Sequence, residues 1–293
     1  MSVLPDTMKY IKFLICARRK REDTQERYFY EWGNIHVSLM LTTPSSMKVF
    51  RRYVQHFALS GVSNDMLIYP RSPMEWDNMA DHWLESYEDF LEALTGESYV
   101  QRMQPHRFGD KDFVLELARG RPLYQAPRFK HGGGVKLTHW FRRKRSLTGQ
   151  EFRARWSNQA RAFLAAATEN GLVRRYVQNF EDEVPASVFK GTLFEHGGVG
   201  GYDGIEEIWF DGVESMARLR SDPKLRDLVL AGMAPLIDEE RSFSMATTER
   251  VVYDLTPAGT SPRPAILDPD SLEARAIAQG YRDWNIPKPV DES

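Results

Sequence analysis

Apolar and polar residues alternate along the first part of the chain in the periods of strands and helices. The apolar run at residues 9–17 and the alternating run Arg51–Phe57 have the period of two that is typical of strands. Large residues spaced by four from Tyr28 to His36 predict an amphipathic helix that begins after an N-cap at Thr24. The predicted elements are, in order, a strand over 9–17, a helix over 25–41, strands over 51–57 and 79–85, a helix over 86–94 and a strand over 113–117.

A second copy of the same pattern follows. The segment Arg51–Phe57 recurs as Arg174–Phe180 with six of seven residues identical, and the basic run Arg18–Arg21 recurs as Arg142–Arg145. Because the spacing between matching residues stays at 123–125, the two halves are interpreted as duplicated modules. The second copy predicts a strand over 135–141, a helix after an N-cap at Thr148, strands over 174–180 and 205–210, a helix over 213–219 and a strand over 250–255.

In both copies the order of the elements is β-α-β-β-α-β, which is the order of the ferredoxin-like unit. The predicted fold class is therefore α+β, with two tandem ferredoxin-like modules at residues 8–120 and 132–256. Residues 118–134, at the junction, are rich in proline and glycine, as is typical of a linker. Residues 257–293 are interpreted as a proline-rich arm with one short helix, anchored by Trp284.

Composition is that of a globular protein and excludes several classes. Lys and Arg number 39 and Asp and Glu 41, so the net charge of −2 gives no general attraction to nucleic acid or to anionic membranes. The single cysteine, Cys16, excludes an intramolecular disulfide and a four-cysteine zinc site. No long apolar run predicts a membrane span and no signal peptide is found, so a cytoplasmic location is expected. The run Gly197–Gly201 lacks dinucleotide-binding spacing, and no two histidines are three or four residues apart, so neither a nucleotide cofactor nor a helical metal pair is predicted.

Several of these motifs together resemble the EthD-domain family. They are a basic loop, the N-cap Thr24, a helix with Tyr30, Trp32 and His36, and the Arg-Arg-Tyr-Val-Gln strand, and the combination occurs twice. The resemblance implies the dimeric α+β barrel superfamily, whose ferredoxin-like units pair through their sheets. Two modules in one chain then imply a fused pair, and whether two such chains pair again is left open. Members of the superfamily include cofactor-free lyases, decarboxylases, isomerases, dehydratases and monooxygenases, and also haem proteins, so the resemblance implies a fold more strongly than a reaction.

Candidate catalytic residues come from a comparison of the two copies. His36 stands where the second copy has Ala160, so the same helix face is ionisable in one half and apolar in the other. The helical histidine of the family corresponds to His36, and a neutral histidine can both take and give a proton near pH 7. Conversely, His139 takes the place of Ile15 on the first strand. For both histidines, the alternative is a core residue that is hydrogen-bonded within the fold.

Further polar groups are candidates to complete this site. His82 lies on a predicted strand, where a spacing of 125 residues makes Glu207 its counterpart. His106 and Asp110 precede the last strand of the first module. The hypothesis is that His36 acts with His82, His106 and Asp110 in catalysis, and the alternative is that these residues are only exposed surface.

Aromatic residues on the two helix faces indicate an apolar, aromatic or polyketide-like substrate. The expected substrate-binding residues are Tyr28, Trp32, Tyr53 and His139. The first hypothesis is therefore a cofactor-independent lyase, dehydratase, decarboxylase or isomerase that acts on a small aromatic compound without a metal. The second is an auxiliary protein that binds a hydrophobic metabolite and supports a monooxygenase. The third is a haem-binding oxidoreductase with a histidine ligand.

Overall fold

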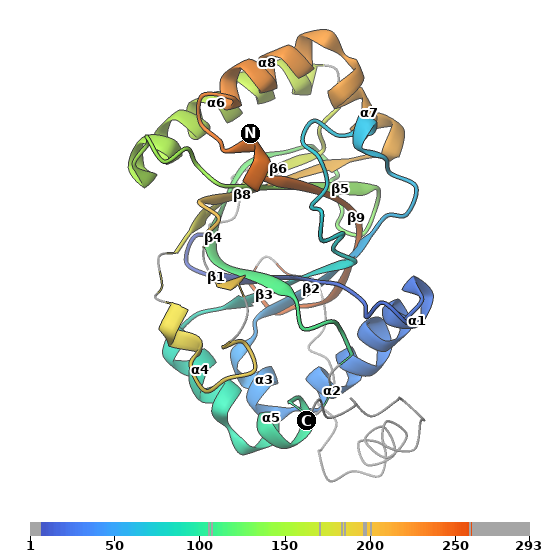
Figure 1. Cartoon of the computed structure of the whole chain (residues 1–293), viewed down its shortest axis with the longest axis vertical. Coiled ribbons are helices and arrows are strands. Elements are labelled where there is room, and N and C mark those ends of the chain that lie inside the picture. The colour runs from blue at the N-terminus through green and yellow to red at the C-terminus, as the bar shows by residue number, and fades with distance from the viewer. Residues whose placement is uncertain are drawn as a thin grey trace.

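The computed structural model describes residues 7–259, except residues 105, 107, 170, 183, 185, 196, 197, 200 and 258. Its centre is a closed antiparallel barrel of eight strands (Figure 1). The strands of the barrel are β1 (Ile11–Ala17), β2 (Arg52–Ala58), β3 (Asn78–Leu84), β4 (Phe113–Gln125), β5 (Val135–Phe141), β6 (Arg175–Glu181), β8 (Gly204–Phe210) and β9 (Phe243–Asp254). The two-residue strand β7 (Gly198–Val199) pairs in parallel with β4 outside the barrel. The predicted arm beyond residue 259, with its helix and Trp284, lies outside the described residues.

The eight strands come in equal numbers from the two halves of the chain. Neighbouring strands follow the order β4-β1-β3-β2 in the first half and β9-β5-β8-β6 in the second. Strand β2 pairs with β9 and β4 pairs with β6, so the two four-stranded sheets close on each other. The first and third strands of each half are direct neighbours, which places Ile15 opposite Ala80 and His139 opposite Glu206.

Helices cover the outside of the barrel on two opposite sides (Figure 1). The first half contributes α1 (Gln25–Tyr30), the π-helix η1 (Glu31–His36), α2 (Val37–Leu41), α3 (Pro44–Val49), α4 (Tyr87–Thr95) and α5 (Glu97–Arg102). The second half contributes α6 (Gly149–Glu169), α7 (Val213–Ser221) and α8 (Pro223–Met233). Short 3-10 helices occur in both halves, at η2 (Asn64–Met66), η3 (Ala186–Phe189) and η4 (Glu239–Arg241). Each helical layer and the sheet beneath it enclose one of the two largest hydrophobic cores. No helix in the described part of the chain has the length and apolar character needed to cross a membrane.

The helices begin where the sequence predicts them because their N-caps form. The hydroxyl of Thr24 accepts a hydrogen bond from the backbone N–H of Arg27. At the start of α6, Thr148 accepts from the N–H of Glu151, and the Glu151 carboxylate accepts from the N–H of Thr148, which is a capping box. The helix α6 then lies so close to the sheet that a Cβ atom on Gly204 would be 2.3 Å from the Trp156 ring, so only glycine fits there.

Strand β4 is longer than the sequence pattern predicts. The proline and glycine content predicts a linker from residue 118, but residues 118–125 continue β4 and pair with β6. The register shifts between Pro122 and Tyr124, and such a bulge is where a strand tolerates a residue without an N–H. The proline therefore marks a bulge within a strand, and the predicted module boundary at residue 120 falls inside β4.

The third strands of the two halves correspond at a spacing of 126 residues, because β3 begins at Asn78 and β8 at Gly204 in the same register against the first strands. His82 therefore corresponds to Ile208, and the predicted match of His82 with Glu207 is wrong by one residue. Since successive strand residues face opposite sides of a sheet, this correction places Glu207 on the inner face of the barrel. The predicted helix over 25–41 is also interrupted, by η1, and the sequence pattern did not predict α3, α5 and α8.

Candidate functional site

Two predicted site residues of the first half lie together with one that was not predicted. His36, at the end of η1, and His106, in the loop before β4, have ring centroids 5.5 Å apart and Nδ1 atoms 3.4 Å apart. Nε2 of His106 lies 2.7 Å from Oε1 of Glu31. These side chains form a continuous series of contacts, Glu31–His106–His36, which we call the relay.

Glu31 and His36 both reach His106 because they lie on a π-helix. In an α-helix of 3.6 residues per turn, residues five apart point about 140° away from each other. In η1 the hydrogen bonds run between residues five apart, so Glu31 and His36 lie nearly above one another. The guanidinium of Arg250 donates a hydrogen bond to the carbonyl of Gly33 within this π-helix. The irregular helix is therefore what brings the carboxylate and the imidazole to one face.

The contacts of the relay fit one arrangement of donors and acceptors on the two rings. The Glu31 carboxylate can only accept, so Nε2 of His106 carries the hydrogen of that contact, and Nδ1 of His106 is assigned as the acceptor toward His36. Nδ1–H of His36 then donates to that acceptor, and Nε2 of His36 is left with a lone pair. Burial, and after it the neighbouring His106 and His82, lowers the pKa of His36 well below its usual value, so this ring is neutral at pH 7. A half-buried neutral imidazole with a free Nε2 can act as a base.

His82 lies beneath the relay on β3 in an aromatic environment. Its ring is stacked on Tyr53 at 4.2 Å and lies 4.6 Å from Phe50. Its Nδ1 atom is buried and has no hydrogen-bond partner in the described part of the chain. Burial lowers the pKa of His82 to about 3. His82 is therefore a neutral neighbour of His36, and its direct part in catalysis stays a prediction.

The other predicted residues of the first half surround the relay or lie away from it. Phe108 is within 5.0 Å of both relay histidine rings, and the ring of Tyr28 lies 5.6 Å from Phe108. Trp32 is buried against Phe57, and its carbonyl accepts from Gln55. Asp110 forms an ion pair with Arg18 at 3.0 Å, and no contact of Asp110 with a histidine occurs among the described residues.

The second half carries a different polar group, next to the helix α6. Nδ1 of His139, on β5, lies 2.7 Å from Oε2 of Glu206, and the hydroxyl of Tyr176 donates to the other oxygen of that carboxylate. Nε2 of His139 is buried and has no hydrogen-bond partner in the described segments. His139 lines a cavity of about 10 Å³, room for a single water, together with Trp156 and Ala160. At the position of His36, the second half thus has the small residue Ala160, and the histidine, His139, lies next to it on the sheet.

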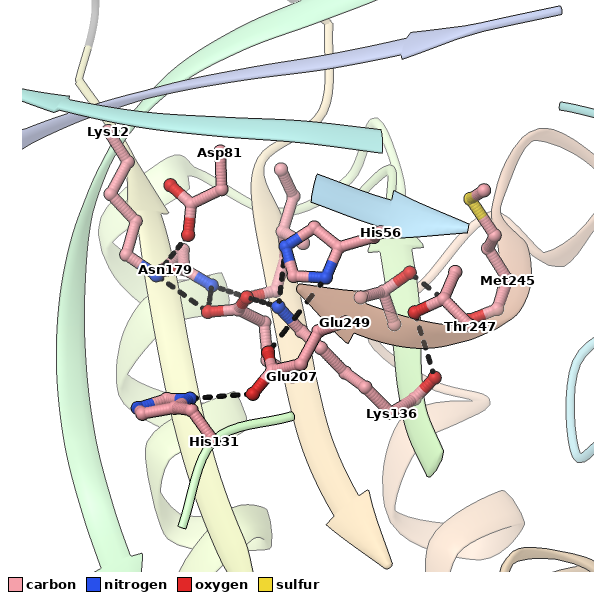
Figure 2. Close-up of polar contacts among 12 residues, drawn as sticks. Lys12, His56, Asp81, His131, Lys136, Asn179, Glu207, Met245, Thr247 and Glu249 are labelled. Atoms are coloured by element: carbon pink, nitrogen blue, oxygen red, sulfur yellow. Dashed lines mark hydrogen bonds and ion pairs between the residues drawn. The ribbon is translucent and has the colours of Figure 1, made fainter. Parts of the chain in front are cut away.

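A third polar cluster lies inside the barrel and joins the two halves (Figure 2). Nζ of Lys12 is 2.6 Å from Oε2 of Glu207, and Nζ of Lys136 pairs with Oε1 of the same carboxylate. Nζ of Lys136 also lies 3.3 Å from Nε2 of His56. Burial tends to raise the pKa of Glu207, but the two lysines outweigh it and hold this pKa well below its usual range. Among the described residues, no group of three His, Cys, Asp or Glu side chains is arranged to hold a metal ion.

Comparison with known proteins identifies the family. The model of the EthD domain matches residues 20–111 and residues 144–240. The chain belongs to the EthD-domain family. Both matched segments of this EthD-domain protein contain the long-helix region of their half, and the first contains all three members of the relay.

Individual relatives of this EthD-domain protein are distant. It is similar to the chalcone isomerase cfoK of Aspergillus candidus, with 23% identity over 259 residues that cover 85% of this chain and 99% of that protein. Among solved structures, a candidate monooxygenase from Fusobacterium nucleatum has a TM-score of 0.48 and 7% identity, covering 83% of this chain and 93% of that one. A chlorite dismutase from Candidatus Nitrospira defluvii has a TM-score of 0.44 and 8% identity, covering 82% and 92%.

Sequence reasoning missed Glu31 and Glu206, the two carboxylates that hold the histidines. Glu31 lies five residues before His36. Residues five apart do not share a face of an α-helix, and this spacing alone does not predict a π-helix. Glu206 had a usable signal, because it stands directly opposite His139 on the neighbouring strand. The one-residue error in the match of the third strands concealed that pairing.

Proposed function

We propose that this EthD-domain protein is an isomerase or lyase that acts on a small, apolar, aromatic molecule by histidine acid/base chemistry. The observation that carries the proposal is the relay Glu31–His106–His36, which leaves Nε2 of His36 free to take a proton. The aromatic rings of Phe108 and Tyr28 beside it favour an aromatic substrate. The similarity to a chalcone isomerase supports an isomerase, since a chalcone is an aromatic enone.

In the proposed reaction, Nε2 of His36 removes a proton from an acidic O–H or C–H group of the substrate. The positive charge that forms on His36 is shared with His106 through the Nδ1 contact, and the Glu31 carboxylate stabilises it. The same proton is then returned to another atom of the substrate, so the isomerisation needs no net proton and no redox partner. In a lyase reaction, the proton would instead go to the leaving group.

The strand order supports a proposal about the architecture of the chain. We propose that each half is a ferredoxin-like module, at residues 8–125 and 132–256, and that the chain is a duplicated and fused pair. The order β4-β1-β3-β2 in one half and β9-β5-β8-β6 in the other supports this, because each half has its fourth strand beside its first. The duplication explains why a polar site can persist in one half while the other changes.

The experiment is turnover of chalcones and related aromatic ketones by the full chain and by single variants. Removal of a general base typically lowers the rate by about 10²–10⁴-fold, which is the loss expected for His36→Ala. Folding should be kept, because α6 carries Ala160 at the same position. Glu31→Gln should lower the rate less and shift its pH dependence. The two histidine rings keep their places but lose the negative charge of the neighbouring carboxylate.

The matched control is His139→Ile, which copies Ile15 of the first half and should keep normal turnover. A dead His139→Ile protein beside an active His36→Ala protein would move the reaction to the second half, where His139 and Glu206 form the other acid/base pair. Binding of these compounds without any turnover would instead support an auxiliary binding protein.

A further inference from the structure

The relay draws its members from two parts of the chain. Glu31 and His36 lie on η1, whereas His106 lies in the loop between α5 and β4, 70 residues after His36. Loops have fewer regular hydrogen bonds than helices and strands, so the position of His106 depends on the contacts that anchor its loop. A displacement of about 1 Å in an active site can lower a rate by about 100-fold. The anchors of this loop therefore decide whether the three side chains stay aligned.

Arg18, in the segment directly after β1, anchors this loop twice. Its backbone carbonyl accepts a hydrogen bond of 2.9 Å from the N–H of Asp110. Its guanidinium lies 3.0 Å from Oδ2 of Asp110 and 2.7 Å from Oδ2 of Asp112, so one side chain binds two carboxylates. An arginine that contacts two carboxylates in a network contributes more than an isolated surface ion pair. Arg18 therefore ties the end of the loop to the barrel.

The anchored end of the loop is connected to His106 by closely packed residues. A Cβ atom on Gly109 would be 3.1 Å from the carbonyl oxygen of Arg18, so the backbone of the loop lies directly on that carbonyl. The preceding residue, Phe108, has its ring 5.0 Å from the ring of His106, at an interplanar angle of 29°. A shift of Asp110 would therefore move Phe108 and, with it, the ring of His106.

The second half shows which of these contacts belongs to the fold in general. There Arg142 takes the place of Arg18, and its carbonyl accepts a hydrogen bond of 2.7 Å from the N–H of Asp238. The backbone contact is thus present in both halves. The guanidinium of Arg142 instead lies over the ring of Tyr202, 4.6 Å from its centre, and has no carboxylate within ion-pair distance among the described residues. In the described part of the chain, the ion pairs of this arginine therefore occur in the half that carries the relay.

We propose that Arg18 is a positioning residue of the relay. By binding Asp110 and Asp112, it keeps the ring of His106 in line with the other two members. Asp110, whose predicted role is catalytic, then contributes through the loop and not by contact with the substrate. The effect of Arg18 on turnover rests on the function proposed above, but its effect on the position of His106 does not.

The test uses Arg18→Met in the full chain, with Arg142→Met as the matched control in the second half. The first measurement is the NMR signal of the proton on Nε2 of His106, which the Glu31 carboxylate shifts downfield and protects from exchange with water. In Arg18→Met this signal should broaden or disappear. The kcat for an aromatic ketone should fall by about tenfold or more, with a smaller change in KM.

Two comparisons separate positioning from a general structural role. Arg18→Lys should restore part of the signal and of kcat, because an ammonium group keeps the attraction but not the geometry that binds two carboxylates. Arg142→Met should leave both unchanged. An equal loss in Arg142→Met would overturn the proposal, since the effect would then be one of general stability.

A second variant removes the same ion pairs from the other side, so the test does not depend on whether Arg18→Met folds. Asp110→Asn combined with Asp112→Asn should give the same loss of the His106 signal while the backbone contact is kept. An unchanged signal in both variants would overturn the proposal, because the loop would keep its place without the ion pairs. Loss of the signal with unchanged turnover would support the positioning role and contradict the proposed function, so the two can fail separately.

Discussion

At the scale of single residues, the surroundings of each histidine decide what it can do. His106 contacts both His36 and the Glu31 carboxylate, so a proton can pass between the two rings. His139 is oriented by Glu206 in the other half. His82 differs from all of these, because its neighbours are the rings of Tyr53 and Phe50 and it lacks a hydrogen-bonding carboxylate among the described residues. At neutral pH the His82 ring contributes packing, and in acid its burial lowers the stability of the folded chain.

The consequence of the His82 environment is a loss of stability in acid. Its pKa is lowered to about 3 in the folded chain, while an exposed histidine has a pKa of about 6.5. Between these values the unfolded chain binds a proton that the folded chain does not, so stability is full above pH 6.5 and falls as the pH is lowered. His82→Ile, which copies Ile208, should remove about 1.4 kcal/mol per pH unit from this slope between pH 6 and pH 4, measured by urea unfolding.

The reverse exchange provides the control for that prediction. Ile208→His places a histidine at the matching position of the second half and should steepen the same slope. If the stability of both variants falls with decreasing pH as steeply as that of the unaltered chain, the His82 ring is protonated in the folded state. The account of its burial is then wrong.

At the scale of elements, the two long-helix regions differ in how an arginine holds them. Arg250 donates to the Gly33 carbonyl of η1 and to Gln55. The equivalent Arg121 donates to the hydroxyl of Ser157, at 2.7 Å on the regular helix α6, and to Gln178. The same arginine–glutamine pair therefore supports a π-helix in one half and an α-helix in the other.

This difference predicts unequal effects of the same substitution. Arg250→Met removes the donor to the Gly33 carbonyl, and we expect the relay to lose its alignment and turnover to fall by about tenfold or more. Arg121→Met should cost a similar amount of stability and leave turnover unchanged. Steady-state kinetics and denaturant midpoints of both variants check this, and an equal loss of turnover in both would show that the arginine matters only for folding.

The elements also show what the sequence can and cannot predict. Most strands were predicted to within one or two residues, because alternation is strong where one face of a strand meets a helix and the other the barrel interior. The start of β9 was predicted at residue 250 instead of Phe243. The end of β4 was also missed, since Pro122 in a bulge has the same appearance as a linker. The convergence of His36 with His106 was predicted, but Glu31 was not, because a π-helix has no signature in residue periodicity. The helices α5 and α8 were missed because each directly follows another short helix.

At the scale of the whole molecule, the barrel interior is more polar than the proposed duplication alone suggests. Joined sheets are expected to meet through an apolar face, and one apolar cluster, including Leu14, Trp140 and Phe243, does span both halves. The rest of the interior holds Lys12, Glu207 and their partners. Closure of the barrel therefore depends on a buried charge network as well as on apolar contact.

The charge network predicts that the halves are most sensitive at Glu207. Glu207→Gln removes the carboxylate that Lys12 and Lys136 share, which leaves Lys136 without an ion-pair partner among the described residues and Lys12 with Asp81 alone. Breaking a buried pair in this way costs about 3–5 kcal/mol. Asp81→Asn, at the matching position of the first half, should cost less, because Asp81 is 3.7 Å from Lys12 and Glu207 remains in place. Guanidinium unfolding at pH 7 measures both losses.

The wild-type chain should also lose stability as the pH falls below about 4.5, the ordinary pKa of a glutamate, because the two lysines hold the pKa of Glu207 in the folded chain below that value. Glu207→Gln should lack that part of the acid transition. Equal losses for the two variants, or an unchanged acid transition in Glu207→Gln, would mean that the lysines are compensated by other groups and that Glu207 does not hold the barrel closed.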